Sequence, residues 1–113
     1  MKLHLQTQYK ENYGAHNWDG EGECPQRWKF KGGIDYMIPL PYDMPSKGLI
    51  QMITELAVVH VERKNYYCEE YVIHWEVVPD DYLTYEEKQQ LEWEGCIEHP
   101  ARRLTLQEIG MAV

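Results

Sequence analysis

The chain has 113 residues and a mass of 13.5 kDa, the size of one domain, and 43% of its residues are hydrophobic. Nineteen acidic against eleven basic residues give a formal net charge of −8, which argues against a protein whose whole surface binds nucleic acid. The longest unbroken apolar run is Leu56–Val59, far short of the roughly 18 residues that a membrane span needs. We therefore expect a single domain over residues 1–113.

The cysteines and the N-terminus indicate a reducing compartment. Cys24, Cys68 and Cys96 are odd in number, widely spaced and free of any C-x-x-C pair, so neither a disulfide framework nor a zinc knuckle is expected. The first residues contain no apolar signal-peptide core. Because free thiols are typical of reducing compartments, we expect a cytoplasmic protein.

The first element is a strand. Residues 1–10 alternate between apolar and polar side chains, which predicts a strand with one buried face. Residues 11–26 have no periodicity and many glycines and asparagines, which indicates a long loop. The strand face expected to be buried carries Met1, Leu3, Leu5, Thr7 and Tyr9.

The next elements are a hairpin and a helix. Alternating runs at 27–31 and 34–40 are separated by Gly32 and Gly33, which predicts two strands joined by a tight turn. Ser46 is the expected N-cap of a long helix over about 47–64. Leu49, Met52, Ile53, Leu56 and His60 recur at helical spacing and should face the sheet. The apolar face is broadened by Ile50, Ala57, Val58, Val59 and Val61.

The second half contains one further strand and one further helix. Residues 67–78 alternate as a strand, with His74 on the same face as Glu70 and Glu76. Thr84 and Glu87 form a capping box that opens a short acidic helix over about 85–94, ending near Gly95. The tail fits either a last strand over 102–106 or a short capped turn from Thr105.

These elements predict an α+β fold. The sheet should be mostly antiparallel with four to five strands, packed by the long helix over about 47–64. The short acidic helix over about 85–94 completes the architecture.

The acidic residues are concentrated in one part of the sequence. Residues 1–68 are neutral overall, whereas residues 69–98 hold ten acids and one base. Such a cluster suits a surface that docks on a basic groove of a protein, in the way that a mimic of nucleic-acid phosphates would. It equally suits a face that only keeps the protein soluble. The acids expected to contact a partner are Glu76, Asp80, Asp81, Glu86 and Glu87.

The loop over residues 11–26 is the second candidate site. Tyr and Trp bury large areas at recognition surfaces and keep a polar atom. A metal-dependent hydrolase built on His16, Asp19 and Glu21 is a weaker hypothesis, because the spacing from His16 to Cys24 in this segment matches no standard metal site. No P-loop, nucleophile elbow or dinucleotide fingerprint occurs, so we expect no catalytic residue and no cofactor. The residues expected to anchor a partner are Tyr13, His16, Trp18 and Trp28.

A nucleic-acid-binding module is the alternative hypothesis. Arg27, Lys29 and Lys31 alternate with Trp28 and Phe30 in the strand over 27–31. Aromatic side chains on a strand can stack on the bases of a single strand while neighbouring cations bind its phosphates. The net charge of −8 weighs against this function.

One segment also carries a resemblance. Tyr9-Lys-Glu-Asn-Tyr-Gly-Ala-His16, Trp18-Asp-Gly20, Glu23-Cys-Pro-Gln26 and Trp28-Lys-Phe-Lys-Gly-Gly33 resemble a segment of small uncharacterised bacteriophage proteins. The resemblance implies a phage origin and an accessory role in the infected cell, and it transfers no catalytic residue. We therefore expect a non-enzymatic protein that inhibits or redirects a host protein, for example as a counter-defence factor against a nucleic-acid-handling defence protein. It should act in the host cytoplasm and away from the membrane. The sequence is also compatible with a homodimer.

Overall fold

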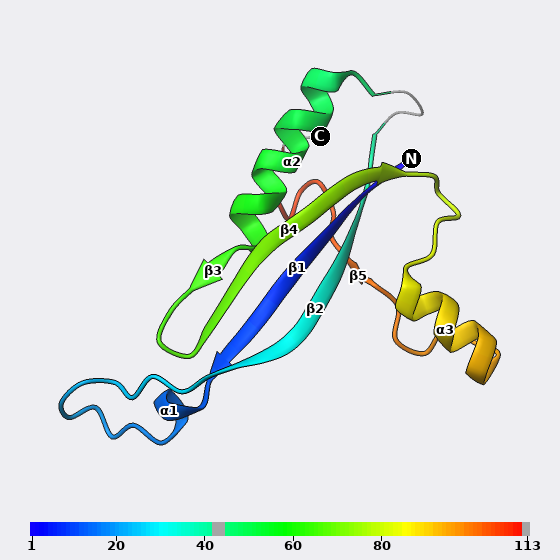
Figure 1. Ribbon diagram of the computed structural model, residues 1–113. Helices are drawn as coiled ribbons and strands as arrows, with labels where there is room; N and C mark the ends of the chain where they lie inside the picture. Colours follow the sequence, from blue (N-terminus) through cyan, green and yellow to red (C-terminus); the bar gives the residue numbers. More distant parts are fainter. Residues whose placement is uncertain (42–44, 112–113) are drawn as a thin grey trace.

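The computed structural model describes residues 1–41 and 45–111, and within them the chain folds around a five-stranded sheet (Figure 1). The strand order is β3-β4-β1-β2-β5, and each neighbouring pair is antiparallel except the parallel pair β2–β5. This arrangement confirms the α+β class and the mostly antiparallel sheet. The elements are β1 (Lys2–Asn12), α1 (Tyr13–His16), β2 (Trp28–Pro39), α2 (Lys47–Val61), β3 (Arg63–Lys64), β4 (Cys68–Val78), α3 (Tyr85–Glu94) and β5 (Arg102–Arg103).

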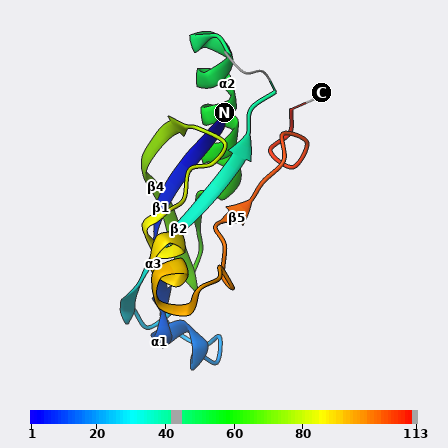
Figure 2. The same cartoon turned by 90° about the vertical axis from the view of Figure 1, so that its right-hand side faces the viewer.

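The two larger helices lie on opposite faces of the sheet. Figures 1 and 2 together show α2 on one face, α3 standing on the other, and the α1 loop at one end of the long strands. The molecule is elongated, with extents of 53 × 38 × 19 Å. Its two faces and its loop end therefore present separate surfaces.

β1 is the central strand, and its side chains alternate as expected, but Met1 is exposed and both faces of the strand are covered rather than one. Leu3, Leu5 and Thr7 are fully buried on the face that α2 covers. The strand continues to Asn12, two residues beyond the expected end. His4, on the opposite face, is also buried, because α3 and the segment that leads into it cover that side.

The expected hairpin at Gly32 and Gly33 is wrong. β2 runs unbroken from Trp28 to Pro39 and pairs with β1 throughout. Tyr9 lies opposite Gly32 and Lys10 lies opposite Phe30, so the chain forms a β-bulge in place of a turn. Gly32 has φ +103°, a left-handed conformation that glycine adopts without steric cost, so the glycine serves the bulge.

A second bulge changes the expected faces of β4. Gln6 pairs with His74 and Thr7 pairs with Val72, which leaves Ile73 between them. The alternation of side chains therefore shifts at this point. Glu70 lies on the α2 face, whereas His74 lies on the opposite face, so the prediction that they share a face is wrong.

α2 begins where the sequence indicates, because the Ser46 side chain accepts a hydrogen bond from the Leu49 amide at 3.2 Å. It ends at Val61, three residues early, because Arg63–Lys64 pairs with β4 as β3. The backbone there gains ladder hydrogen bonds that a longer helix would forfeit.

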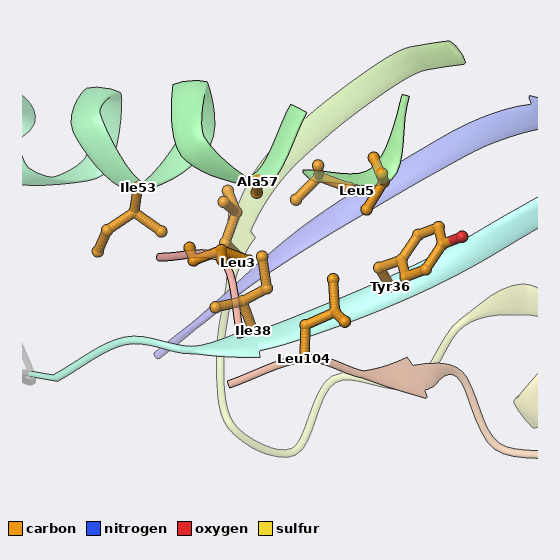
Figure 3. Packing of buried hydrophobic residues seen from close by; sticks show 9 residues of the cluster. Leu3, Leu5, Tyr36, Ile38, Ile53, Ala57 and Leu104 are labelled. Atoms are coloured by element: carbon orange, nitrogen blue, oxygen red, sulfur yellow. The ribbon is translucent and has the colours of Figure 1, made fainter. Parts of the chain in front are cut away.

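The side of α2 that faces the sheet agrees with the expected one except at Met52, Val59 and His60. The helix buries Ile53, Ala57 and Val61, whereas those three side chains are exposed. The small Ala57 allows the helix to approach the sheet closely. Figure 3 shows Ile53 and Ala57 over the inward-facing strand residues, with Leu104 joining from the tail. The cluster combines Leu3, Leu5, Tyr36, Ile38, Ile53, Ala57, Val61, Leu104 and Ile109.

The capping box of α3 is present as expected. The Thr84 hydroxyl accepts from the Glu87 amide, and the Glu87 carboxylate accepts from the Thr84 amide. Gly95 ends the helix in a left-handed conformation, with φ +76°. In the tail, the Thr105 hydroxyl accepts from the Glu108 amide in the expected turn. The strand covers Arg102–Arg103 alone, and not the alternative range 102–106.

Candidate partner-binding surfaces

The aromatic residues expected to bind a partner gather at the loop end of the sheet. The His16 ring lies 6.1 Å from the Tyr13 ring and 5.9 Å from the Tyr67 ring. The Trp18 ring lies 5.8 Å from the ring of Tyr66. These contacts fasten the loop to the turn that precedes β4, so the rings also have a structural role.

Asn12 organises this loop, and sequence reasoning did not single it out. Its side chain is fully buried, and its carbonyl oxygen accepts from the amides of Gly14 and Arg27 at 3.1 and 2.9 Å. Its Nδ2 donates to the carbonyl of Tyr66 at 3.0 Å. One amide group therefore joins both ends of the loop to the next turn, which satisfies three backbone groups.

The basic and aromatic side chains of residues 27–31 do not form one continuous surface. Alternation along β2 places Trp28 and Phe30 on one face and Lys29 on the other. Lys29 and Lys31 lie over the ring of Tyr13, with Nζ 5.9 and 5.0 Å from its centroid. A strand of nucleic acid stacked on Trp28 and Phe30 would therefore be separated from these two lysines by the sheet.

The acidic residues lie far from the aromatic loop. Asp80 lies 2.9 Å from the N-terminal ammonium of Met1, whereas Trp28 pairs with Asn12 at the other end of β1. The 11 residues of β1 span about 37 Å. The two groups expected to bind one partner together therefore occupy opposite ends of the sheet.

Several of these acids already have partners within the molecule. The N-terminal ammonium donates a hydrogen bond to Asp80 and lowers the pKa of its carboxyl. Glu87 is buried in the capping box, whereas Glu76 lies 3.6 Å from His4 Nδ1 without a hydrogen bond between them. Among the described residues, Asp81 and Glu86 are exposed and form no ion pair, so they remain available.

The outer side of α3 carries an aromatic surface that sequence reasoning missed. Tyr85, Gln89 and Trp93 follow at intervals of four residues and therefore share one side of the helix. Trp93 is 81% exposed and Tyr85 is 74% exposed. The Gln89 amide donates to the Tyr85 hydroxyl at 2.7 Å, which links two members of the row. We call this row, together with its flanking acids Glu86 and Glu92, the α3 stripe.

The spacing of the stripe was visible in the sequence, but its exposure was not. A row at i, i+4 and i+8 is ordinarily the side of a helix that packs on the core. Here, among the ten residues of α3, all within the described range, Glu87 alone is buried. The capping box directs that side of α3 inward, and the aromatic row consequently faces solvent.

No residues are placed as a metal centre in the described part of the chain. Within 1–41 and 45–111, no group of three histidine, cysteine or acidic side chains is arranged to hold a metal ion, and this includes His16, Asp19 and Glu21. Asp19 instead accepts a hydrogen bond from the Glu21 amide at 2.9 Å. In the same described ranges, none of the helices is both long and apolar enough to cross a membrane.

Comparison with known proteins adds no relative. No protein-family model, curated protein or solved structure matches this chain. The function of this chain is therefore inferred from the surfaces described above.

Proposed function

We propose that this chain is a non-enzymatic accessory protein that binds a partner protein through the α3 stripe. The observation that carries the proposal is the exposure of Trp93 and Tyr85 on one side of a helix that packs little of itself on the sheet. Burying a large apolar side chain contributes about 1.5–3 kcal/mol. A small domain that leaves both rings in solvent gives up this stabilisation, which a partner would restore.

The chemistry of the stripe indicates an apolar groove with a basic rim. Tryptophan and tyrosine are the residues that most often dominate binding energy at interfaces. An amphipathic helix commonly presents such anchors to a groove at intervals of three and four residues. Glu86 and Glu92 flank the rings, and Asp81 lies nearby in sequence, so basic side chains around the groove would complement them.

This proposal refines the hypothesis drawn from the acidic segment. A basic groove on a nucleic-acid-handling protein has the required charge, and a helix seated there would inhibit that protein or redirect it. The phage origin and the role in an infected cell rest on the Tyr9–Gly33 resemblance. The cytoplasmic location rests on the free thiols of Cys24, Cys68 and Cys96.

The nucleic-acid alternative receives less support. Trp28 and Phe30 lie on the sheet face opposite Lys29, so the stacking rings and this cation are separated. An acidic protein also repels a polyanion. Phe30 provides the matched control for the stripe residue Trp93, because it is also an exposed aromatic residue, 56% accessible, and lies at the loop end.

The proposal is tested by affinity capture from nuclease-treated bacterial lysate. Wild-type protein is compared with Trp93→Ala and with the matched control Phe30→Ala. We expect a specific protein on the wild type and on the Phe30→Ala variant, released by salt, and a roughly 30-fold or greater loss of affinity for Trp93→Ala. Glu86→Gln with Glu92→Gln should reduce the salt dependence of binding.

Other outcomes contradict the proposal. Equal capture by the wild type and Trp93→Ala would show that the stripe is not the binding surface. Recovery of nucleic acid that Phe30→Ala abolishes in the absence of nuclease would favour the alternative. Sedimentation of the pure wild type as a dimer that Trp93→Ala converts to monomer would show that a second copy occupies the stripe.

A further inference from the structure

A second surface, on the α2 face, concentrates the positive charge of this acidic chain. A cavity of about 450 Å³ lies where the end of α2, β3 and β5 meet. The chain has four arginines and a net charge of −8, and three of the four line this cavity. The polar residues around it are Tyr36, His60, Arg63, Glu70, Arg102 and Arg103.

Arg63 is held in place by a buried carboxylate. Glu70 is 2% exposed, and its Oε2 accepts from the Thr7 hydroxyl at 2.8 Å and from the Tyr36 hydroxyl at 2.6 Å. Its Oε1 lies 3.4 Å from Nε of Arg63, and the guanidinium rests on the ring of Tyr9. Within the described residues, the terminal nitrogens of Arg63 form no hydrogen bond, so they are free to bind a ligand.

Arg102 is the arginine that the sheet places over this cavity, whereas Arg103, the next residue of β5, pairs with Met37 and also lines the cavity of Asp80, Asp81 and Glu87. Arg102 lies opposite Tyr36 in the parallel pairing of β2 and β5, with Cζ 6.0 Å from the Tyr36 ring. The Leu104 amide donates to the Met37 carbonyl at 2.9 Å and anchors the tail. Among the described residues, neither Arg102 nor Arg103 forms an ion pair.

The acids near the cavity are already engaged. Glu70 forms an ion pair with Arg63 and accepts hydrogen bonds from two hydroxyl groups. Glu62, the residue before Arg63, accepts from the Val72 amide at 3.0 Å. The cavity therefore presents guanidinium donors and the imidazole of His60 with little competing negative charge.

We propose that this cavity binds the phosphate group of a small phosphorylated molecule. The planar guanidinium fork matches phosphate oxygens with two parallel hydrogen bonds, which makes arginine the preferred residue for this group. The cavity falls within the range of 300–1,000 Å³ that is typical of small-molecule sites. A long nucleic acid is disfavoured, because a polyanion would also meet the negative field of the whole chain.

The site is independent of the proposed function. α2 and α3 lie on opposite faces of the sheet, so the cavity and the α3 stripe do not share residues (Figures 1 and 2). Failure of one proposal leaves the other intact.

The test is calorimetric titration of the full chain with pyrophosphate, inorganic phosphate and a deoxythymidine oligonucleotide. We expect pyrophosphate to bind more tightly than phosphate, and Arg102→Gln to weaken pyrophosphate binding about 10-fold or more. The affinity of Arg102→Lys for pyrophosphate should lie between those of the wild type and Arg102→Gln, because lysine keeps the positive charge but lacks the planar guanidinium. Arg27→Gln, an exposed arginine at the loop end, is the matched control and should bind as the wild type does.

Thermal unfolding of each ligand-free variant verifies that it is folded, which the exposure of Arg102 favours. No heat from pyrophosphate at millimolar concentration would overturn the proposal. So would equal binding by the wild type and Arg102→Gln. Binding of the oligonucleotide in preference to pyrophosphate would also overturn the proposal, because it would show that the cavity is part of a nucleic-acid-binding surface.

Discussion

At the scale of single residues, the polar network in the core is the feature that shapes the α2 face. Glu70 is a fully enclosed carboxylate, and burial of such a charge is tolerated because Thr7, Tyr36 and Arg63 all engage it. Figure 3 shows the Tyr36 hydroxyl directed away from the apolar cluster. The same ring thus packs on the core at its body and binds the carboxylate at its tip.

This environment makes the free energy of unfolding fall at alkaline pH. Burial, followed by the hydrogen bond to Glu70, raises the pKa of Tyr36 from 10.0 to about 12. Below pH 10 the folded and unfolded chains both hold the phenolic proton. Between pH 10 and 12 the unfolded chain loses a proton that the folded chain keeps, so the free energy of unfolding falls by about 2–3 kcal/mol from this group.

Tyr36→Phe isolates the effect. At pH 8 the variant should be less stable by about 1–3 kcal/mol, because Glu70 loses a donor. The difference in the free energy of unfolding between the variant and the wild type should shrink as the pH rises toward 12. Urea unfolding at several pH values measures it, with the exposed Tyr85→Phe as the control that should follow the wild type. A difference that stays constant with pH would contradict the account.

At the scale of elements, short sequence patterns predict the features that depend only on neighbouring residues. The N-caps at Ser46 and Thr84, the left-handed end at Gly95 and the alternation of residues 1–10 each depend on neighbouring residues, and the structure contains all of them. Gly32 and Gly33 were misread, because a bulge and a hairpin both need glycine. The choice between them depends on β1, which lies more than twenty residues away.

The same reason explains the errors in β4 and at the end of α2. The bulge at Ile73 exists because β1 pairs with β4 in two registers, which no pattern within 67–78 reveals. Arg63–Lys64 has helical propensity but forms β3, because tertiary pairing overrides propensity. The fold class was therefore predictable, whereas the register was not.

The two N-caps provide a matched test of the role of α3. Thr84→Ala and Ser46→Ala should each cost about 0.5–2 kcal/mol of stability, because each removes a side-chain acceptor from a helix start. Thr84→Ala should also weaken partner capture, since α3 would fray. Ser46→Ala should leave capture unchanged. Equal effects of both variants on capture would indicate that binding follows overall stability rather than the order of α3.

At the scale of the whole molecule, charge and aromatic residues are distributed over separate surfaces. The sequence indicated an acidic segment and an aromatic loop, but the expected loop over 11–26 contains the end of β1 and the helix α1 (Tyr13–His16). A linear pattern could not show that β1 holds the two groups at opposite ends. It also could not show that Trp93 faces solvent, because exposure depends on which side of α3 the capping box directs inward. Asn12 and Glu70 were missed for a related reason, since polar residues in a sequence are ordinarily exposed.

The arginine cavity illustrates the same limit. Arg63 and Arg102 are separated by 39 positions in the sequence, and only the sheet order brings both to one cavity. Neither carries a motif that a sequence pattern would detect. Their convergence is a property of the fold, as is the separation of this cavity from the α3 stripe.

The most direct test of the central claim is site-specific photo-crosslinking in bacterial cells. A photo-reactive amino acid replaces Gln89, an exposed residue of the α3 stripe between Tyr85 and Trp93, in one variant, so that both aromatic anchors remain in place. A second variant carries it in place of Phe30 at the loop end. We expect one cellular protein to be crosslinked from position 89, and no crosslink to that protein from position 30. Crosslinks to it from position 30 alone, or none from position 89, would contradict the claim that α3 is the docking surface.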